Sequence, residues 1–288
     1  MAGLSRPLFV LGTVACLSLS ACGGDGSGDG KALPFSSIPR VDFNRRAAEL
    51  YLPLFWREDA NNNGALEPNE LAFLTGIEDT ETTGWSDESG RFSQAFRTAY
   101  GHMSKPDPEP TDAAEQTRQR LIREELAQGR PTLVATDLGQ SSEADKNFMG
   151  RMLAVAELIE RIYARQKGVF GMGADIPESD TASRMVFHRN QSPFCEAPKT
   201  ENQEACSALA KKPPRVVGLY PAEMQSDEKF CAALEKQPNA KDLMGHFSVV
   251  VATDRPGSYV AVPYTEAYAQ EMGAIARELE VAANGLGD

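Results

Sequence analysis

Residues 59–70 constrain this chain more than any other part of its sequence. Oxygen-bearing side chains stand at alternate positions in the first half, a glycine is sixth, and glutamates are ninth and twelfth. A Ca²⁺ ion takes roughly 6 to 8 oxygen ligands at about 2.3 to 2.6 Å, and a tight loop can supply them from alternate residues. The expected ligands, with the alanine acting through its backbone carbonyl, are Asp59, Asn61, Asn63, Ala65, Glu67 and Glu70.

This spacing resembles the calcium loop of EF-hands. The resemblance implies that Gly64 provides the positive φ of the sharp turn, that Glu70 binds through both carboxylate oxygens and that Leu66 is the apolar residue through which such loops pair. It also implies flanking helices, and residues 43–58 and 69–76 are compatible with them. We therefore expect one helix-loop-helix site with Ca²⁺ as its cofactor. The alternative is an acidic, Asn-rich surface turn.

A second calcium loop would begin at Asp79, but its pattern is incomplete. Its eighth position is Ser86 and its twelfth is Gly90, where an apolar residue and a glutamate are needed. The eight residues between Glu70 and Asp79 are too few for two helices. A single hand must then pack on its own domain, pair with a partner's loop or dimerise.

The amino terminus has the features of an export signal. Arg6 precedes an apolar run from Leu8 to Leu19, which is too short to span a bilayer. Leu19 to Cys22 resembles the bacterial lipobox, which implies that residues 1–21 are a lipoprotein signal peptide and that Cys22 is lipidated. Residues 22–34 would then form a glycine-rich, flexible tether. Cleavage without lipidation is the alternative.

The lipobox resemblance places the protein in a bacterial cell envelope. Glycine after the lipidated cysteine is consistent with the outer membrane, facing either the periplasm or the cell surface. The formal net charge of −12 disfavours nucleic acid as a partner. We therefore expect attachment to the membrane through the lipid, allow for an unknown protein partner, and attribute the charge itself to solubility.

Three cysteines follow the tether, and an exported chain can keep disulfides. A bridge between Cys195 and Cys206 would close a short polar loop and is the favoured pairing, with Cys206 to Cys231 as the second choice. Cys231 also suits a buried thiol in an apolar helix. None of the three histidines stands beside a cysteine, so the cysteines do not indicate a zinc site.

The rest of the chain favours a mainly α fold. We expect an EF-hand-containing helical region at 35–104 and a second helical region at 105–288, which ends in a small β-hairpin and a terminal helix. The proline-rich segment 105–110 separates them. Predicted helices cover residues 92–103, 112–128, 142–167 and 264–283, and the hairpin strands cover residues 247–252 and 258–262.

Catalytic signatures are absent from the sequence. It contains no nucleophile elbow, phosphate loop or dinucleotide fingerprint, and His102, His188 and His246 are isolated. Residues 215–283 resemble the non-catalytic part of bacterial dipeptidyl-peptidase III-like proteins. Members that cut peptides use a zinc-binding His-Glu-x-x-Gly-His segment, which this sequence lacks, so no catalytic residue is carried over.

Together these features predict a calcium-binding exported lipoprotein that is not an enzyme. The ion would stabilise a helical domain or a surface that binds a partner. The alternative is a catalytically inactive or accessory relative of a zinc dipeptidyl-peptidase III-like hydrolase.

Overall fold

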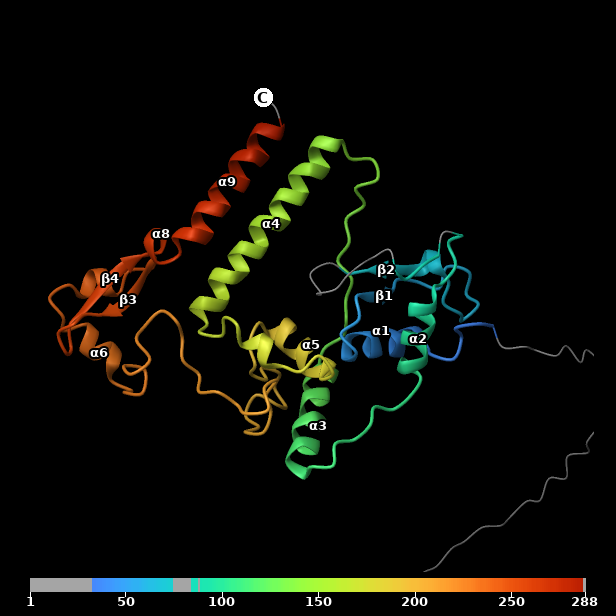
Figure 1. Cartoon of the computed structure of the whole chain (residues 1–288), viewed down its shortest axis with the longest axis horizontal. Coiled ribbons are helices and arrows are strands. Elements are labelled where there is room, and N and C mark those ends of the chain that lie inside the picture. Colours follow the sequence, from blue (N-terminus) through green and yellow to red (C-terminus); the bar gives the residue numbers. More distant parts are fainter. Residues whose placement is uncertain (1–32, 75–83, 88, 287–288) are drawn as a thin grey trace, which may run out of the picture. The chain divides into compact units, whose positions relative to one another are not determined.

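Helices account for most of the regular structure in the computed structural model, which describes residues 33–74, 84–87 and 89–286 (Figure 1). Contacts within the chain separate Met1–Leu33 from Pro34–Asp288, and only the second unit is described below. The predicted signal peptide, Cys22 and most of the tether therefore lie outside the described residues. No helix in the described part is both long and apolar enough to cross a membrane.

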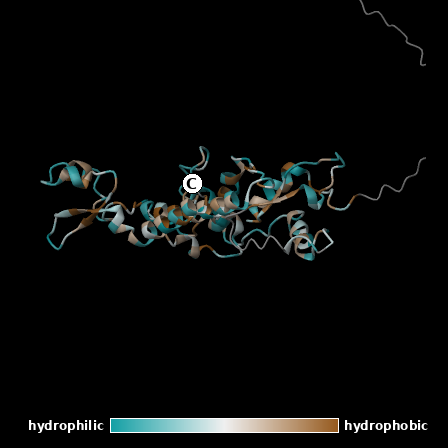
Figure 2. Cartoon of the chain, turned by 90° about the horizontal axis from the view of Figure 1, so that it is seen from above, coloured by the Kyte–Doolittle hydropathy of each residue, from teal (hydrophilic) through white to brown (hydrophobic). Residues whose placement is uncertain are grey.

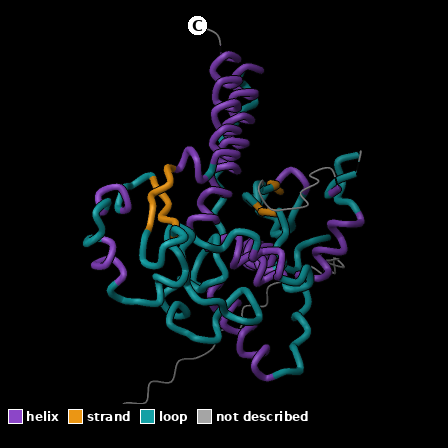
Figure 3. Tube along the Cα trace, turned by 60° about the vertical axis from the view of Figure 1, so that its left-hand side comes forward, coloured by secondary structure: helices purple, strands orange, loops and turns teal. Residues whose placement is uncertain are grey.

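The helices of Pro34–Asp288 alternate with two short pairs of strands (Figure 3). In chain order the elements are α1 (Arg40–Glu49), β1 (Leu54–Trp56), β2 (Leu71–Phe73), α2 (Gln94–Met103), α3 (Ala113–Ala127), α4 (Glu143–Gln166), α5 (Thr181–Asn190), α6 (Phe230–Leu234), α7 (Ala240–Leu243), β3 (Ser248–Ala252), β4 (Tyr259–Pro263), α8 (Tyr264–Ala267) and α9 (Ala269–Leu286). The prediction of a mainly α fold with a small hairpin near the carboxyl end is confirmed.

Local capping explains where the predicted helices begin. Asp112 accepts the Glu115 N–H at 2.9 Å and starts α3, and Ser142 accepts the Asp145 N–H at 3.1 Å and starts α4. Such side chains satisfy backbone donors that a helix leaves unpaired at its first turn. Hydrophobic and hydrophilic residues are interspersed along the helices in Figure 2.

The first buried cluster is aromatic and lies around the β1–β2 pair. Phe43 of α1 and Phe96 of α2 are both 0% exposed, and Trp56 of β1 is 1% exposed. Strands β1 and β2 are antiparallel, with Leu54 opposite Phe73 and Trp56 opposite Leu71. The Asn44 amide exchanges two hydrogen bonds with the Trp56 backbone, at 2.7 and 3.1 Å, so α1 is tied to β1.

Two further clusters lie later in the chain. Leu121, Ile122 and Val186 join α3 to α5 beside the disulfide. Leu234, Leu243 and Val250 pack α6 and α7 against the β3–β4 hairpin, whose register pairs Val250 with Ala261. The hairpin follows the predicted strands to within one residue.

The helix predicted at 43–58 forms only as far as Glu49, and no α-helix forms in the described part of residues 69–76. Helix α1 ends at Glu49, Tyr51 has a φ of +53°, and β1 begins at Leu54. Proline at position 53 opposes a helix through 43–58 because it lacks an N–H and restricts the residue before it. After the loop, a 3-10 turn at Pro68–Glu70 leads into β2, since pairing with β1 buries the apolar residues there. The helix-loop-helix prediction is therefore wrong, and the segment is a strand-loop-strand.

Candidate metal site

The loop between β1 and β2 holds all six predicted calcium ligands. The Arg57 N–H donates to the Glu70 carbonyl at 2.9 Å and closes the base of the loop. At its apex Gly64 has a φ of +71°, which a glycine adopts at little cost. The predicted turn is therefore present, although strands rather than helices hold its ends.

Asp59 organises the turn through its carboxylate. Its two oxygens accept the N–H groups of Asn63 at 3.0 Å and Gly64 at 2.9 Å. These two bonds fold the chain back over the first ligand position. Backbone hydrogen bonds alone thus hold the aspartate oxygens at the inner side of the turn.

The two asparagines bring Glu67 to the same turn. The amide groups of Asn61 and Asn63 donate to the Glu67 carboxylate at 3.0 and 3.1 Å. The Asn63 Oδ1 atom also accepts the Ala65 N–H at 2.7 Å. Four of the six predicted ligand residues, at loop positions 3, 5, 7 and 9, are consequently linked to one another by hydrogen bonds.

Glu70, the predicted bidentate ligand, is buried with 1% of its surface exposed. One carboxylate oxygen accepts the Ala60 N–H at 2.7 Å and the other accepts the Glu67 N–H at 3.2 Å. No lysine or arginine of the described residues forms an ion pair with it. A buried carboxylate with spare lone pairs and no cationic side chain fits a divalent cation chemically.

The loop is not a closed cage of acids. In the described part of the chain, no three carboxylates have ligand atoms that all lie within 4.8 Å of one another. The asparagine amides stand between the acids, so each would have to turn its oxygen toward an ion. Ala65 and Leu66 are buried, and the Leu66 N–H donates to the Phe35 carbonyl at 3.1 Å, which anchors the second half of the loop to the aromatic cluster.

Asp87, from the weaker second loop, makes a local turn of another kind. Its carboxylate accepts the Ser89 hydroxyl at 2.6 Å and the N–H groups of Ser89 and Arg91, both at 2.9 Å. These bonds, the Ser89 hydroxyl above all, lower its pKa to about 2. Asp79 and most of that segment lie outside the described residues.

The structure joins Cys195 to Cys206 by a disulfide, and Cys231 is a free, exposed thiol. Glu125 lies beside this bridge, fully buried. The three residues do not constitute a metal site, because both sulfurs are oxidised. Glu125 accepts bonds from Arg189, Asn190, Thr200 and the N–H groups of Glu196 and Ala197. Burial alone would raise its pKa, and the hydrogen bonds outweigh burial and lower it.

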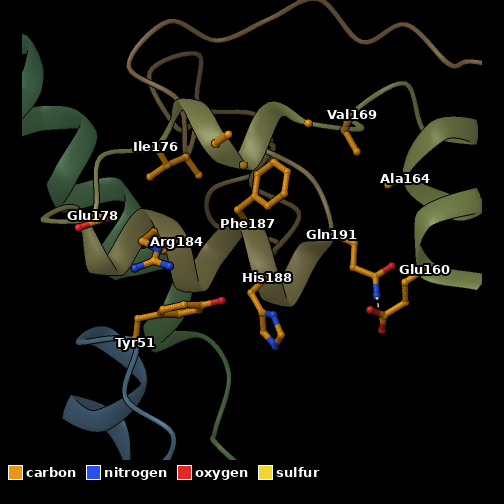
Figure 4. A pocket seen from close by; sticks show the side chains of 13 residues that line it. Tyr51, Glu160, Ala164, Val169, Ile176, Glu178, Arg184, Phe187, His188 and Gln191 are labelled. Carbon is orange, nitrogen blue, oxygen red and sulfur yellow. Dashed lines mark hydrogen bonds between the residues drawn. The ribbon is translucent and has the colours of Figure 1, made fainter. Parts of the chain in front are cut away.

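Sequence reasoning missed a pocket of about 640 Å³ beside α5 (Figure 4). The guanidinium carbon of Arg184 lies 4.6 Å from the centre of the Tyr51 ring, and the His188 ring is 5.9 Å from it. Gln191 donates to Glu160 at 3.5 Å across the far side. The one signal in the sequence was the i, i+4 spacing of Arg184 and His188. The pocket combines both charge signs with aromatic walls, and these contacts do not select a ligand.

Comparison with known proteins identifies no family. No family model matches the chain, and no curated protein matches it. Two solved structures are similar to it, dipeptidyl-peptidase III from Corallococcus sp. strain EGB and from Caldithrix abyssi. Each is 21% identical over 58% of this chain, with TM-scores of 0.48 and 0.45, and the matches cover 32% and 31% of those longer chains. The chain thus spans about a third of their length, and they carry the family name suggested by residues 215–283.

Proposed function

We propose that this protein binds one calcium ion in the loop from Asp59 to Glu70 and is not an enzyme. The observation that carries the proposal is Glu70, a carboxylate 1% exposed that lacks a cationic side-chain partner in the described residues and lies at the twelfth loop position. The turn around Gly64 and the linked side chains of Asn61, Asn63 and Glu67 support it. Because strands flank the loop, the proposed site is a calcium-binding hairpin.

The proposed role of the ion is to stabilise the aromatic cluster rather than to act as a switch. Sensor hands work by changing the angle between two helices, and no such helix pair flanks this loop in the described residues. An ion bound only to the folded state adds RT ln(1 + [L]/Kd) to stability. Sites outside the cytosol tend toward Kd values of about 10⁻⁴ to 10⁻³ M.

Calcium titration followed by melting tests the proposal. At about 10 mM Ca²⁺ we expect a gain of roughly 1.4 to 2.7 kcal/mol and a rise of about 3 to 10 °C in melting temperature. About 10 mM Mg²⁺ should give less, since Mg²⁺ demands a tighter octahedral site. The Ca²⁺-dependent rise should vanish in Glu70→Gln and in Asp59→Asn.

The comparison is made within each variant, with and without Ca²⁺, because both substitutions also weaken loop hydrogen bonds. Asp87→Asn is the matched control, since it alters a carboxylate in an acidic turn without the ligand pattern, and it should keep the full rise. A Ca²⁺-dependent rise that is unchanged in Glu70→Gln and Asp59→Asn would remove the loop from the explanation.

For the location, we propose attachment to a bacterial envelope through a lipid on Cys22. The lipobox resemblance and the glycine-rich tether support this. Cys22→Ser should release the protein from the membrane fraction and remove incorporation of labelled palmitate. Continued membrane attachment of that variant would contradict the lipid anchor.

The second candidate is an inactive or accessory relative of dipeptidyl-peptidase III-like hydrolases. The lack of a His-Glu-x-x-Gly-His segment in this sequence favours inactivity. Assaying hydrolysis of a panel of peptide and ester substrates, with and without EDTA, distinguishes an inactive relative from an active hydrolase. Activity that zinc restores after EDTA, and calcium does not, would contradict the proposal that this chain is not an enzyme.

A further inference from the structure

Helices α4 and α9 lie side by side and antiparallel, although about a hundred residues separate them in the chain (Figures 1 and 3). Arg151 pairs with Glu278 at 2.9 Å and Arg165 pairs with Glu271 at 2.8 Å. Val155, Ile162 and Ala282 are buried at the seam between the helices. We call these two helices the α4–α9 pair.

Apolar side chains of the α4–α9 pair are more numerous than one seam can cover. Apart from Val155 and Ile162, the apolar residues of α4 are only partly buried, because α9 covers one side of the helix. Exposed apolar residues remain on both helices: Met149 at 39%, Ile159 at 53% and Tyr163 at 44% on α4, with Leu279 at 44% and Leu286 at 47% on α9.

These five residues share one side of the pair, whereas Leu153, 54% exposed, lies on the side of α4 that faces away from the seam. A helix turns about 100° per residue, so each side chain can be placed around its axis relative to the seam. The two ion pairs mark one side of the seam on both helices. Ile159 and Tyr163 point to the other side of α4, and because α9 runs antiparallel, Leu279 and Leu286 point to that same side. Val281, 48% exposed, faces the side of the ion pairs.

We propose that this apolar face binds the same face of a second copy of the chain, so that two α4–α9 pairs form a four-helix bundle. Two antiparallel helices with a common apolar side are half of such a bundle. A two-fold axis lets each copy offer the identical patch to the other. The calcium loop takes no part, and the pocket beside α5 adjoins the face only through Glu160 and Ala164 of α4.

The dimensions of the face suit a stable dimer. The 18 residues of α9 make a helix about 27 Å long, and two helices abreast are about 20 Å wide. The projected footprint is therefore on the order of 500 Å² per copy, and side-chain relief adds to the accessible area. Specific interfaces bury about 600 to 1,000 Å² per partner.

Charge also selects a second copy over a membrane as the occupant. Helix α4 carries four acidic and four basic side chains, and α9 carries three acidic and one basic. The net charge is thus 0 for α4 and −2 for α9, against −12 for the whole chain, so two pairs can meet with little repulsion. It also lacks the excess of lysine and arginine with which amphipathic helices bind anionic lipid.

Sedimentation velocity of the full chain tests the proposal. Cys16→Ser, Cys22→Ser and Cys231→Ser form the background, so that neither a lipid nor a free thiol can join copies. We expect twice the monomer mass of 31.2 kDa at about 10 µM. Adding Ile159→Glu and Leu279→Glu should weaken association at least about 100-fold, since two buried apolar contacts are lost and charges are placed in the interface.

Val281→Glu is the matched control, because it introduces the same charge at an equally exposed apolar position on the other side of α9. It should leave the dimer intact, and circular dichroism should show all variants folded. A background chain that stays monomeric at about 100 µM overturns the proposal. The proposal is also overturned if the dimer persists in the Ile159→Glu, Leu279→Glu double variant. It is likewise overturned if Val281→Glu weakens the dimer as much as the double variant does. Binding of a monomeric chain to phosphatidylcholine vesicles would assign the face to a membrane instead.

Discussion

Two buried glutamates in this protein differ in the partners that surround their carboxylates. Glu125, at 0% exposure, is neutralised by Arg189 and further bonded to Asn190 and Thr200. Glu70, at 1% exposure, accepts only two backbone N–H groups, those of Ala60 and Glu67. Glu125 lies near the end of α3 and Glu70 ends a 3-10 turn, yet both are equally buried, so burial alone does not distinguish them.

The difference lies in the source of the compensating charge. A buried carboxylate is costly unless it is paired or bonded. The chain itself supplies every partner of Glu125, which makes that region a structural joint between α3 and the disulfide loop. Around Glu70 the described residues supply two backbone N–H groups and no cationic side chain. A cation from outside is therefore the natural partner there, and the following experiments test this contrast.

The largest effect is expected from Glu125→Ala. Removing it leaves the Arg189 charge and several buried donors unpaired, which should cost about 3 to 5 kcal/mol. Urea unfolding should show the same loss with Ca²⁺ and with EDTA. Glu124→Ala changes the neighbouring carboxylate, whose side chain is 40% exposed and pairs with Arg120, and it should cost less than about 1 kcal/mol. A Ca²⁺-dependent loss in Glu125→Ala would erase the contrast between the two regions.

Chelation should loosen one region and not the other. Amide hydrogen exchange at Asn63 and Gly64 should accelerate by about 10- to 100-fold when EDTA replaces Ca²⁺, since the ion contributes to the local opening free energy. The amides of Glu196 and Ala197, which donate to Glu125, should keep their protection. Equal acceleration in both regions would point to a global effect of the ion.

The pH dependence should follow the carboxylates that the protein pairs internally. Burial would raise the pKa of Asp180, but hydrogen bonds from Arg118, Gln119 and Ser183 outweigh it and lower the pKa, as they do for Glu125. A carboxyl group whose pKa is lowered by folding stabilises the folded state at pH values above its unfolded pKa of about 4. That stabilisation is lost as the pH falls through the pKa of the folded state. Asp180→Asn should flatten the fall in stability on acidification below about pH 4. An unchanged slope in urea unfolding would contradict this assignment.

The smallest effect concerns the charge of the loop. Asn63→Asp raises the number of carboxylates at the ligand positions from three to four, and calorimetry should show calcium binding tightened by about 10-fold. Without calcium the variant should be slightly less stable, because the new aspartate repels Glu67. Weaker binding in this variant would mean that Asn63 does not face the ion.

The parts of the fold that were predictable from sequence depend on neighbours in the chain. Asp112 and Ser142 cap the helices that follow them, and Asp59 with Gly64 forms the turn, all through bonds within five residues. The β3–β4 hairpin likewise needs only its own turn. Such features require no knowledge of distant segments.

The remaining features depend on contacts that no local pattern reveals. The pairing of β1 with β2 and the Asn44 bonds to Trp56 displaced the expected helix, and Pro53 was the local warning against it. The partners of Glu125 are 64 to 75 residues away in the chain. The apolar spacing of residues 142–167 predicted a helix, but only the position of α9 shows which side of α4 is covered.

Trp56 gives the proposed site a built-in optical reporter. Its indole N–H donates to the Glu58 carbonyl at 2.7 Å, one residue before Asp59, and its backbone is fixed by Asn44. Ordering of the loop would therefore alter the polarity around a fluorophore that solvent does not reach. Emission from this indole, separated from that of Trp85 by a Trp85→Phe substitution, would follow occupancy of the loop without any added dye.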